Sequence, residues 1–356
     1  MIKDEYSSFK IVHHPEVIAA LKQKQDIVPT QVHFIPTNKC NQNCNFCAYR
    51  MEGYSSAQTF TPVDEIPTSK ALELINSMAS IGVKAIQFTG GGEPLVHRGI
   101  SQMLSLCVQR GLDIAMVTNG MNLEGTAASL LAIHGSWVRI SIDAGSKETY
   151  ANIRRTSIAV YDKVINNIKN FVSMKSKDCI LGIGFVVTKD NYHEVYNCAR
   201  KMKELGVDNF RISAAFTTEG SSYFDDFRKD AHDRCRKVKE VLEDEKFTVF
   251  NLFDDRNDDL SSGTQEYDFC PMKNLVVYLG ADQNLYTCCV QAYNQNGLIG
   301  SVKDQTFEEL WNSEERLTLY QTHNPRKNCK VPCMFEKKNN IINYFIKPDA
   351  KHINYI

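Results

Sequence analysis

Three cysteines near the amino-terminal end of the chain, Cys40, Cys44 and Cys47, have the spacing C-x-x-x-C-x-x-C. Three thiolates so close together can hold three irons of a cubane iron–sulfur cluster and leave the fourth iron open to another ligand. A zinc knuckle is the rival interpretation, and it needs a fourth Cys or His nearby. The nearest histidines are His33 upstream and His97 downstream. The spacing therefore favours an iron–sulfur centre with an open iron.

The elements that must position this loop follow an alternating pattern. Short β-rich runs alternate with amphipathic segments, which is typical of repeated β-α units around a parallel sheet. Sites in barrels of this kind lie at the carboxyl ends of the strands, and Cys40 follows the first predicted strand by a few residues. We expect an α/β fold, a partial (β/α)6 TIM-like barrel, with strands near 32–36, 84–89, 112–118, 137–143, 179–187 and 209–213.

Alternation along the strands predicts a polar interior. In the fifth strand, Leu181, Ile183 and Phe185 share one face with Cys179, while Gly182 and Gly184 lie on the other. The bulky face must meet the helices. Because burying unpaired charge costs several kcal/mol, we expect the interior to hold water or a ligand. The inward side chains are Gln87, Thr89, Asn119, Arg139, Ser141, Asp143, Arg211 and Ser213.

The cysteine loop, with Phe46 before its last cysteine, resembles the cluster loop of the radical S-adenosylmethionine (radical SAM) superfamily. The resemblance implies a [4Fe–4S] cluster whose open iron is chelated by SAM. One electron from the cluster then breaks the sulfonium to give a 5'-deoxyadenosyl radical, so that the cofactor does the difficult chemistry. Phe46 is implied to lie against adenine.

The turn Thr89-Gly90-Gly91-Gly92-Glu93-Pro94 is similar to the turn that takes the methionine amino group in this family. Glycine lets the backbone approach a ligand closely, and a carboxylate suits an ammonium group. Arg154 matches an arginine that binds the SAM carboxylate, and its alternative is an exposed helix arginine. The implied SAM contacts are Phe46, Gly91, Gly92, Glu93, Asn119, Ser141, Asp143, Arg154, Gly184 and Val186.

A second group of cysteines lies toward the carboxyl end, at Cys270, the adjacent Cys288 and Cys289, Cys329 and Cys333. A hairpin pattern at 275–286 and a predicted helix from Thr306 with Glu309 in capping-box register separate them. This region resembles the twitch extension, a shortened SPASM domain, which implies an auxiliary [4Fe–4S] cluster with Cys270, Cys288, Cys329 and Cys333 as ligands. A zinc site is the alternative.

Adjacent strand residues face opposite ways, so one of the paired cysteines is left over; which of the two ligates stays open. We assign Cys288 as the ligand and Cys289 as a candidate catalytic hydrogen-atom donor. The remaining thiols, Cys107, Cys179, Cys198 and Cys235, are expected to pack as small hydrophobes in the core.

Composition excludes several classes of function. A formal net charge of -1 argues against a nucleic-acid footprint, and no stretch has the length of a membrane span or the pattern of a signal peptide. A cytoplasmic enzyme is expected. We divide the chain into an amino-terminal extension (1–31), a radical SAM partial barrel (32–253), a linker (254–268), and an auxiliary-cluster domain with its tail (269–356).

Two cubane clusters suit an enzyme that abstracts a hydrogen atom from its substrate and then removes one more electron from it, a net two-electron oxidation. We therefore predict a radical SAM oxidoreductase in which the auxiliary cluster accepts that electron. An electron donor such as flavodoxin or ferredoxin is implied. Inward Arg139 and Arg211 would suit a phosphate or carboxylate, unless they pair with Asp143. Many members of the family that modify peptides carry an amino-terminal winged domain for the leader peptide, whereas here only 1–31 precedes the first strand. The resemblance therefore implies a small-molecule substrate: a sugar, aminocyclitol or nucleotide-linked sugar.

Two other functions stay open. A peptide maturase, such as an epimerase or thioether-forming enzyme, would use a thiol near Cys288 and Cys289 or the second cluster. A non-catalytic iron–sulfur redox sensor or zinc-stabilised binding module belongs to another class, and metal analysis would distinguish it from the enzymes.

Overall fold

The computed structural model describes residues 6–51, 58–255, 260, 265, 267–329, 333–347 and 351. Its centre is the predicted parallel sheet, and the six expected strands are confirmed. They are β1 (Gln31–Phe34), β2 (Ala85–Phe88), β3 (Asp113–Thr118), β4 (Gly135–Ser141), β5 (Ile180–Val187) and β6 (Asn209–Ala214). The helices between and after them are α2 (Thr68–Ile81), α3 (Ile100–Gln109), α4 (Gly125–His134), α5 (Lys147–Arg154), α6 (Ile158–Met174), α7 (Val195–Glu204) and α8 (Arg228–Leu242).

The sheet is longer than the sequence pattern predicts. It has ten strands in the order β10-β9-β8-β1-β2-β3-β4-β5-β6-β7. Strand β7 (Thr248–Leu252) extends it beyond β6, and β8 (Val276–Leu279) pairs in parallel with β1. Strands β9 (Asn284–Tyr286) and β10 (Leu298–Ser301) follow in antiparallel pairing. The predicted hairpin therefore joins the barrel sheet, while the domain boundaries stay a prediction.

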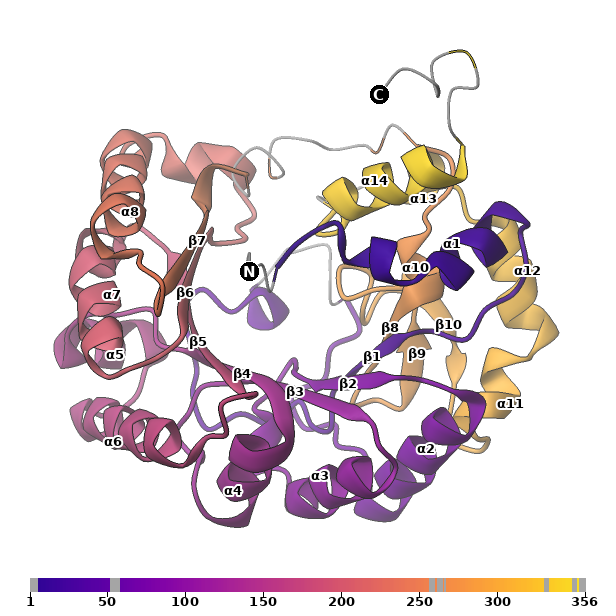
Figure 1. Ribbon diagram of the computed structural model, residues 1–356, viewed down its shortest axis with the longest axis horizontal. Helices are drawn as coiled ribbons and strands as arrows, with labels where there is room; N and C mark the ends of the chain where they lie inside the picture. The colour runs from indigo at the N-terminus through magenta and orange to yellow at the C-terminus, as the bar shows by residue number, and fades with distance from the viewer. Residues whose placement is uncertain are drawn as a thin grey trace.

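Figure 1 shows the sheet as an open arc with α2 to α8 along its convex side. The apolar face of β5 packs there as predicted, since Leu181, Ile183 and Phe185 are buried in the main core. On α6, Val164, Ile168 and Phe171 lie in the same core. Each such side chain contributes about 1.5–3 kcal/mol by leaving water. The concave side is left for polar groups.

Helices from the amino-terminal and carboxyl-terminal regions, α1 (Pro15–Lys22) and α14 (Glu336–Ile346), pack together beside β8 (Figure 1). Helix α1 contributes Leu21, and α14 contributes Ile342 and Ile346 to one small apolar cluster. The other carboxyl-terminal helices are α10 (Met272–Leu275), α11 (Phe307–Trp311), α12 (Glu314–Thr322) and α13 (Pro325–Asn328). Short 3-10 helices are η1 (Lys10–His13), η2 (Ala48–Arg50), η3 (Pro94–Val96), η4 (Tyr192–Glu194), η5 (Gly220–Phe224) and η6 (Gln295–Gly297).

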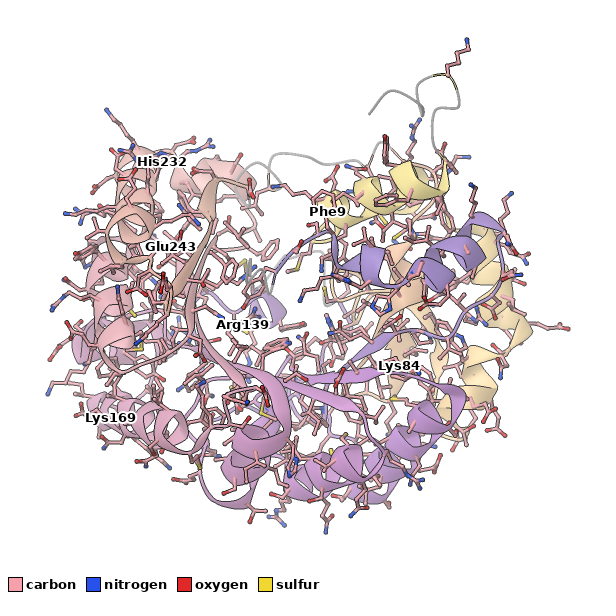
Figure 2. The ribbon with its side chains drawn as sticks, viewed as in Figure 1. Phe9, Lys84, Arg139, Lys169, His232 and Glu243 are labelled. Atoms are coloured by element: carbon pink, nitrogen blue, oxygen red, sulfur yellow. The ribbon has the colours of Figure 1, made fainter. Side chains whose placement is uncertain are left out.

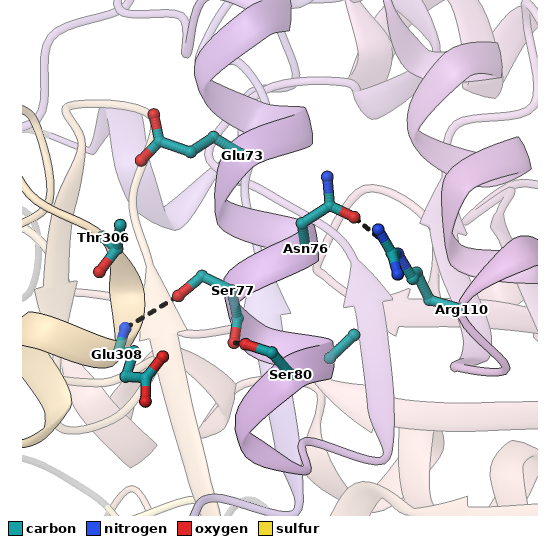
Figure 3. A pocket seen from close by; sticks show the side chains of 8 residues that line it. Glu73, Asn76, Ser77, Ser80, Arg110, Thr306 and Glu308 are labelled. Carbon is teal, nitrogen blue, oxygen red and sulfur yellow. Dashed lines mark hydrogen bonds between the residues drawn. The ribbon is translucent and has the colours of Figure 1, made fainter.

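The predicted capping box at the start of α11 is confirmed, because Thr306 Oγ1 accepts from the Glu309 amide at 3.2 Å and Glu309 Oε2 accepts from the Thr306 amide at 2.7 Å. Figure 3 shows how this helix start meets α2 across a surface groove, where the Glu308 amide donates to Ser77 Oγ at 3.0 Å. The carboxyl-terminal part is thus fastened to a barrel helix as well as to the sheet.

The predicted linker, 254–268, lies largely outside the described residues. Within the described part of the chain, no helix combines the length and apolar character that crossing a bilayer requires.

Candidate functional site

The first cysteine group lies on the loop that leaves β1, at the carboxyl ends of the parallel strands. Cys40, Cys44 and Cys47 are all partly exposed, and Cys44 is near enough to raise the pKa of both other thiols. Burial is the larger cause, and it raises the pKa of Cys40 to about 11. Such thiols become thiolates only beside a strong cationic partner, as metal ligands do. The donor set therefore fits the predicted cluster.

Arg154, the last residue of α5, gathers several predicted site residues around it. Its Nη1 donates to Cys44 Sγ at 3.4 Å, and its Nη2 donates to the Ser141 carbonyl at 2.8 Å and to the Asp143 carboxylate. The guanidinium lies 5.5 Å from the centre of the Phe46 ring. With only 5% of its surface exposed, Arg154 is not the solvent-exposed helix arginine of the alternative interpretation, which is wrong.

Asp143 links the ends of two strands. It is 1% exposed, pairs with Arg154, and accepts a hydrogen bond from the Val186 amide at 2.6 Å. Across the same pair of strands, Ser141 is in register with Gly184. Four of the predicted SAM contacts thus lie beside one another at the ends of β4 and β5, while their role in binding SAM stays a prediction.

The glycine turn after β2 packs directly against the residues that precede Cys40. A Cβ atom at Gly92 would overlap the Lys39 carbonyl oxygen, and one at Gly91 would overlap the Phe60 ring. The Glu93 amide donates to that same Lys39 carbonyl at 2.9 Å. Only glycine permits this approach, so the turn holds the cysteine loop in place.

Glu93 itself is 2% exposed. Its carboxylate accepts from Thr118 Oγ1 at 2.6 Å and from the Asn119 amide at 2.7 Å, and the Asn119 side chain donates to Asn41 at 2.7 Å. Burial raises the pKa of the Glu93 carboxyl, and these donors oppose the shift. The carboxylate is therefore held in a fixed position beside the cysteine loop, as a partner for an ammonium group should be.

The second cysteine group brings together residues far apart in sequence. Cys270 precedes α10, Cys329 ends α13, and Cys333 precedes α14. Burial, followed by the nearby Cys333, raises the pKa of Cys270 to about 12 and that of Cys329 to about 11. The three thiols are therefore neighbours. Lys330, Val331 and Pro332 lie outside the described residues.

The paired cysteines lie after the end of β9, outside the strand whose alternation the prediction assumed. Burial, followed by the nearby Cys289, Cys333 and Cys270, raises the pKa of Cys288 well above its usual range. Cys289 instead lines an interior cavity, with its Sγ 3.9 Å from Met334 Sδ. These directions favour Cys288 as the ligand, although the assignment stays a prediction.

The tail contributes a residue to this group that the sequence pattern does not indicate. Asn339 on α14 is completely buried, accepts from the Met272 amide at 3.0 Å, and lies 3.5 Å from Cys270 Sγ. Tyr267 donates to Cys333 Sγ at 3.4 Å. No motif distinguishes Asn339 from its neighbour Asn340, so only the packing of α14 identifies it.

Lys273 provides an independent test of what the second cysteine group can hold. It is 2% exposed, and among the described residues no carboxylate lies within ion-pair distance of it. Burial lowers its pKa to about 8, while Cys270 and Cys329 oppose the shift. A buried lysine that has no carboxylate partner among the described residues and follows Cys270 by three positions fits an anionic group with four thiolate ligands.

Zinc bound by the same four cysteines stays the alternative for the second group.

The predicted polar interior is confirmed as a cavity of about 390 Å³. Its wall includes Gln87, Arg139, Gly182 and Arg211 from the inward face of the sheet. Figure 2 shows Arg139 on the concave side of the arc, whereas Lys169 lies on the outer helices. The cavity also reaches Cys289 and Cys333, so it borders the second cysteine group.

The cavity borders the predicted SAM residues as well. A Cβ atom at Gly184 would lie 3.5 Å from Arg139 Cδ, and Arg139 belongs to the cavity wall. The suggestion that Arg139 pairs with Asp143 is wrong, because Asp143 pairs with Arg154. Arg139 lies instead 3.5 Å from the Tyr6 hydroxyl. The interior space therefore adjoins the second cysteine group directly, and it approaches the predicted SAM residues through Arg139 beside Gly184.

Alternation could have identified two further wall residues, His33 and Asn209. His33 is in register with the inward Gln87 of the neighbouring strand, and Asn209 lies two residues before the inward Arg211 on its own strand. Tyr6, Lys10 and Lys338 come from the ends of the chain, and no local pattern indicates them. The core thiols behave as expected, since Cys107, Cys179, Cys198 and Cys235 are completely buried.

Comparison with known families agrees with this arrangement. The model of the radical SAM superfamily matches residues 34–202. A model for SPASM, an iron–sulfur cluster-binding domain, matches residues 270–334. The two matches cover the two cysteine groups.

Curated relatives match about half of the chain. A probable GTP 3',8-cyclase from Sulfurisphaera tokodaii is 28% identical over 177 residues, which are 49% of this chain and 53% of the relative. An S-adenosylmethionine-dependent nucleotide dehydratase from Flammeovirga pacifica is 27% identical over 172 residues, 48% of this chain and 58% of the relative. The chain thus spans little more than half the length of these relatives.

Solved structures share the fold over most of the chain. SuiB from Streptococcus suis superposes with a TM-score of 0.63 at 15% identity, covering 94% of this chain and 79% of SuiB. The protein anSMEcpe with bound AdoMet gives a TM-score of 0.55 at 15% identity, covering 87% and 88% of the two chains. At such identities the likeness is one of fold.

Proposed function

Because the chain belongs to the radical SAM superfamily and carries a SPASM domain, we propose that it abstracts hydrogen from an anionic small molecule held in the interior cavity. Its cofactors are [4Fe–4S] clusters and SAM. When bound, the first cluster supplies the electron that converts SAM to a 5'-deoxyadenosyl radical. We assign Cys40, Cys44 and Cys47 to that cluster, and Cys270, Cys288, Cys329 and Cys333 to the second.

The residues around Arg154 and Glu93 would hold SAM. Glu93 suits the amino group and Arg154 the carboxylate, since each side chain carries the opposite charge. Phe46, Gly91, Gly92, Asn119, Ser141, Asp143, Gly184 and Val186 complete the proposed site. Arg154 bridges this site and the cluster loop through Cys44, which would keep SAM close to the open iron.

The single observation that carries the choice of substrate is the charge of the cavity wall. Arg139, Arg211 and Lys338 come from three separate elements and line the same space. Burial lowers the pKa of His33 to about 4, and Lys338 and Arg139 lower it further. An imidazole surrounded by cations stays neutral near pH 7. Because the wall holds five Lys and Arg side chains and two carboxylates, those of Asp255 and Glu336, it carries a surplus of positive charge that a phosphate or carboxylate would balance.

A hydroxyl-bearing substrate suits Asn209, which shares one face of β6 with Arg211. Asn209 is 2% exposed, and its Oδ1 is buried without a hydrogen-bond partner. A buried acceptor of this kind costs about 1–3 kcal/mol unless a ligand donates to it. A sugar phosphate, nucleotide or nucleotide-linked sugar has both groups. The names of the two curated relatives, a GTP cyclase and a nucleotide dehydratase, support a nucleotide.

The proposed net reaction is a two-electron oxidation. The substrate loses a hydrogen atom to the deoxyadenosyl radical, and the resulting carbon radical then loses one electron and one proton. The cavity borders Cys333, so the electron would pass to the second cluster over a short distance. A flavodoxin or ferredoxin would supply and remove electrons.

The test is formation of 5'-deoxyadenosine by the reconstituted protein with dithionite, SAM and a panel of compounds. The panel pairs nucleotides and sugar phosphates with their unphosphorylated forms and includes one peptide. We expect the phosphorylated members to stimulate formation, and Arg139→Met to reduce that stimulation at least tenfold. Arg110→Met, at the surface groove of Figure 3, is the control. Stimulation by neutral compounds or the peptide alone would contradict the proposal.

A second candidate function is favoured by one observation, the Cys289 thiol on the cavity wall. A thiol there could return a hydrogen atom to the substrate radical, which would make the reaction an epimerisation of a sugar or peptide. The resulting sulfur radical would take one electron from the second cluster and one proton from solvent. In D2O, epimerisation would place one deuterium on the product, and Cys289→Ala would abolish that label. The oxidation leaves no solvent deuterium on the product carbon.

A further inference from the structure

Lys273 lies on the short helix α10, three residues after Cys270. Its backbone amide donates toward the Cys270 thiol and lowers the pKa of that group. The side chain then turns into the protein, where only 2% of the residue remains exposed. A lysine ammonium is rarely buried so completely unless an anion accompanies it.

The surroundings of this ammonium contain no such anion among the described residues. Lys273 Nζ donates to the Tyr320 carbonyl at 2.6 Å, and it lies 4.9 Å from the Tyr320 ring and 6.0 Å from the Phe269 ring. The Tyr320 hydroxyl donates back to the Lys273 carbonyl at 2.6 Å. One carbonyl and two rings do not offset the cost of burying a full charge.

The neighbouring buried cation is different. Arg316 on α12 is completely buried, but both of its terminal nitrogens donate hydrogen bonds to the Asp26 carboxylate at 2.5 Å. The local chain thus supplies a carboxylate for one of the two cations. For Lys273 the described residues supply no carboxylate, and its helix α10 begins two residues after Cys270. We therefore expect the counter-charge in what the second cysteine group would hold.

We propose that Lys273 is a positioning residue for the second cluster, whose buried charge compensates the cluster and raises its reduction potential. The proposal rests on the proposed function, because it assumes a cluster at these cysteines. A cubane with four thiolates is anionic, and reduction adds one more negative charge. A nearby cation in a poorly solvated site stabilises the reduced form more than the oxidised form. The cluster would accordingly accept an electron from a substrate radical more readily.

The experiment isolates the second cluster in the full chain. The background variant Cys40→Ala/Cys44→Ala/Cys47→Ala removes the first set of ligands. In that background, Lys273→Met removes the charge, Lys273→Arg keeps it, and Lys303→Met removes an exposed lysine as the control. The measurements are iron and sulfide content, the electron paramagnetic resonance signal of the reduced cluster, and its midpoint potential by anaerobic titration.

We expect about four irons per chain in the background variant. Lys273→Met should lower the midpoint potential of the cluster by at least about 59 mV, a tenfold change in the one-electron equilibrium. Lys273→Arg and Lys303→Met should each change that potential by less than half of this amount. If Lys273→Met cannot retain the cluster but Lys273→Arg can, the charge requirement is supported through assembly instead.

Two results would overturn the inference, and they are distinguishable. A cluster that forms in every variant with the same potential would exclude the role of Lys273 and leave the proposed function intact. A background variant without iron would remove the second cluster itself, and with it that part of the proposed function.

Discussion

At the scale of single residues, Arg154 is a residue that a family resemblance indicates and whose contacts in the structure explain its position. The sequence indicates it only by its distance from Ser141. The structure adds that it is buried, pairs with Asp143 and donates to Cys44. Its position depends on α5 ending at Arg154, because the next residue, Arg155, has a φ of 49° that terminates the helix. Such burial depends on tertiary packing, so the spacing of motifs cannot reveal it.

Arg154→Met should destabilise the protein strongly. Removing one partner of a buried ion pair leaves Asp143 without a counter-charge and costs about 3–5 kcal/mol. Urea unfolding of the reconstituted protein, followed by circular dichroism, measures the free energy of unfolding. The adjacent Arg155 is exposed, so Arg155→Met should change that free energy by about 0.5 kcal/mol or less. Equal effects of the two variants would contradict the role assigned to the buried pair.

The paired cysteines allow an equally direct comparison. Cys288 faces the other cysteines and Cys289 faces the cavity. We expect Cys288→Ala to lower the iron content of the reconstituted protein from about eight to about four atoms per chain, since one cubane is lost. Cys289→Ala should keep about eight. The reverse pattern would assign the ligand to Cys289.

At the scale of elements, the β-α units were predictable because apolar alternation is strong in buried strands. Strand β5 illustrates this, with Leu181, Ile183 and Phe185 all on the helix side. Strand β7 was missed because Thr248–Leu252 is only partly buried and follows the highly charged helix α8. The sequence also could not show that β8 pairs with β1, since parallel pairing between distant segments leaves no local pattern.

The pairing of β8 with β1 brings the carboxyl-terminal part against the first cysteine loop. Tyr293 donates to Asn38 Oδ1 at 2.7 Å and accepts from the Ala281 amide at 3.1 Å. Tyr49, two residues after Cys47, lies 3.1 Å from the Tyr278 hydroxyl. These contacts join the two cysteine groups through elements that the sequence places in separate regions.

Tyr293→Phe should weaken this junction. The change leaves Asn38 Oδ1 and the Ala281 amide without their partner in a buried site, which costs about 1–3 kcal/mol. Thermal unfolding measures the effect, and Tyr344→Phe is the matched control because Tyr344 is 70% exposed. A drop in melting temperature for both variants, or for neither, would show that the junction does not depend on this hydroxyl.

At the scale of the whole molecule, the two chain ends close the concave side of the sheet. Tyr6 and Lys10 line the cavity together with Lys338 from α14, and α1 packs against α14 (Figure 1). The tail after Met334 carries no motif, yet it supplies Asn339 to the second cysteine group and Lys338 to the cavity. Long-range packing of this kind is the part of the site that sequence patterns cannot provide.

The ion pair between Asp26 and Arg316 joins the segment after α1 to α12 across 290 positions of sequence. Asp26→Asn would leave the buried Arg316 with a neutral partner. Because Asp26 is 45% exposed, water offsets part of the loss, and we expect a cost of about 1–3 kcal/mol. Asp304 is an exposed aspartate that precedes α11, and Asp304→Asn is the control in urea unfolding. An unchanged midpoint for Asp26→Asn would contradict the fastening role.

The central claim is that an open iron at Cys40, Cys44 and Cys47 cleaves SAM. The most direct measurement is 5'-deoxyadenosine, quantified by mass spectrometry after the reconstituted, dithionite-reduced protein meets SAM. We predict 5'-deoxyadenosine from the wild-type chain and at least a hundredfold less from Cys44→Ala, which removes one ligand of the first cluster while keeping about four irons at the second. A wild-type protein with about eight irons that forms no 5'-deoxyadenosine, or a Cys44→Ala variant as active as the wild type, would contradict the claim.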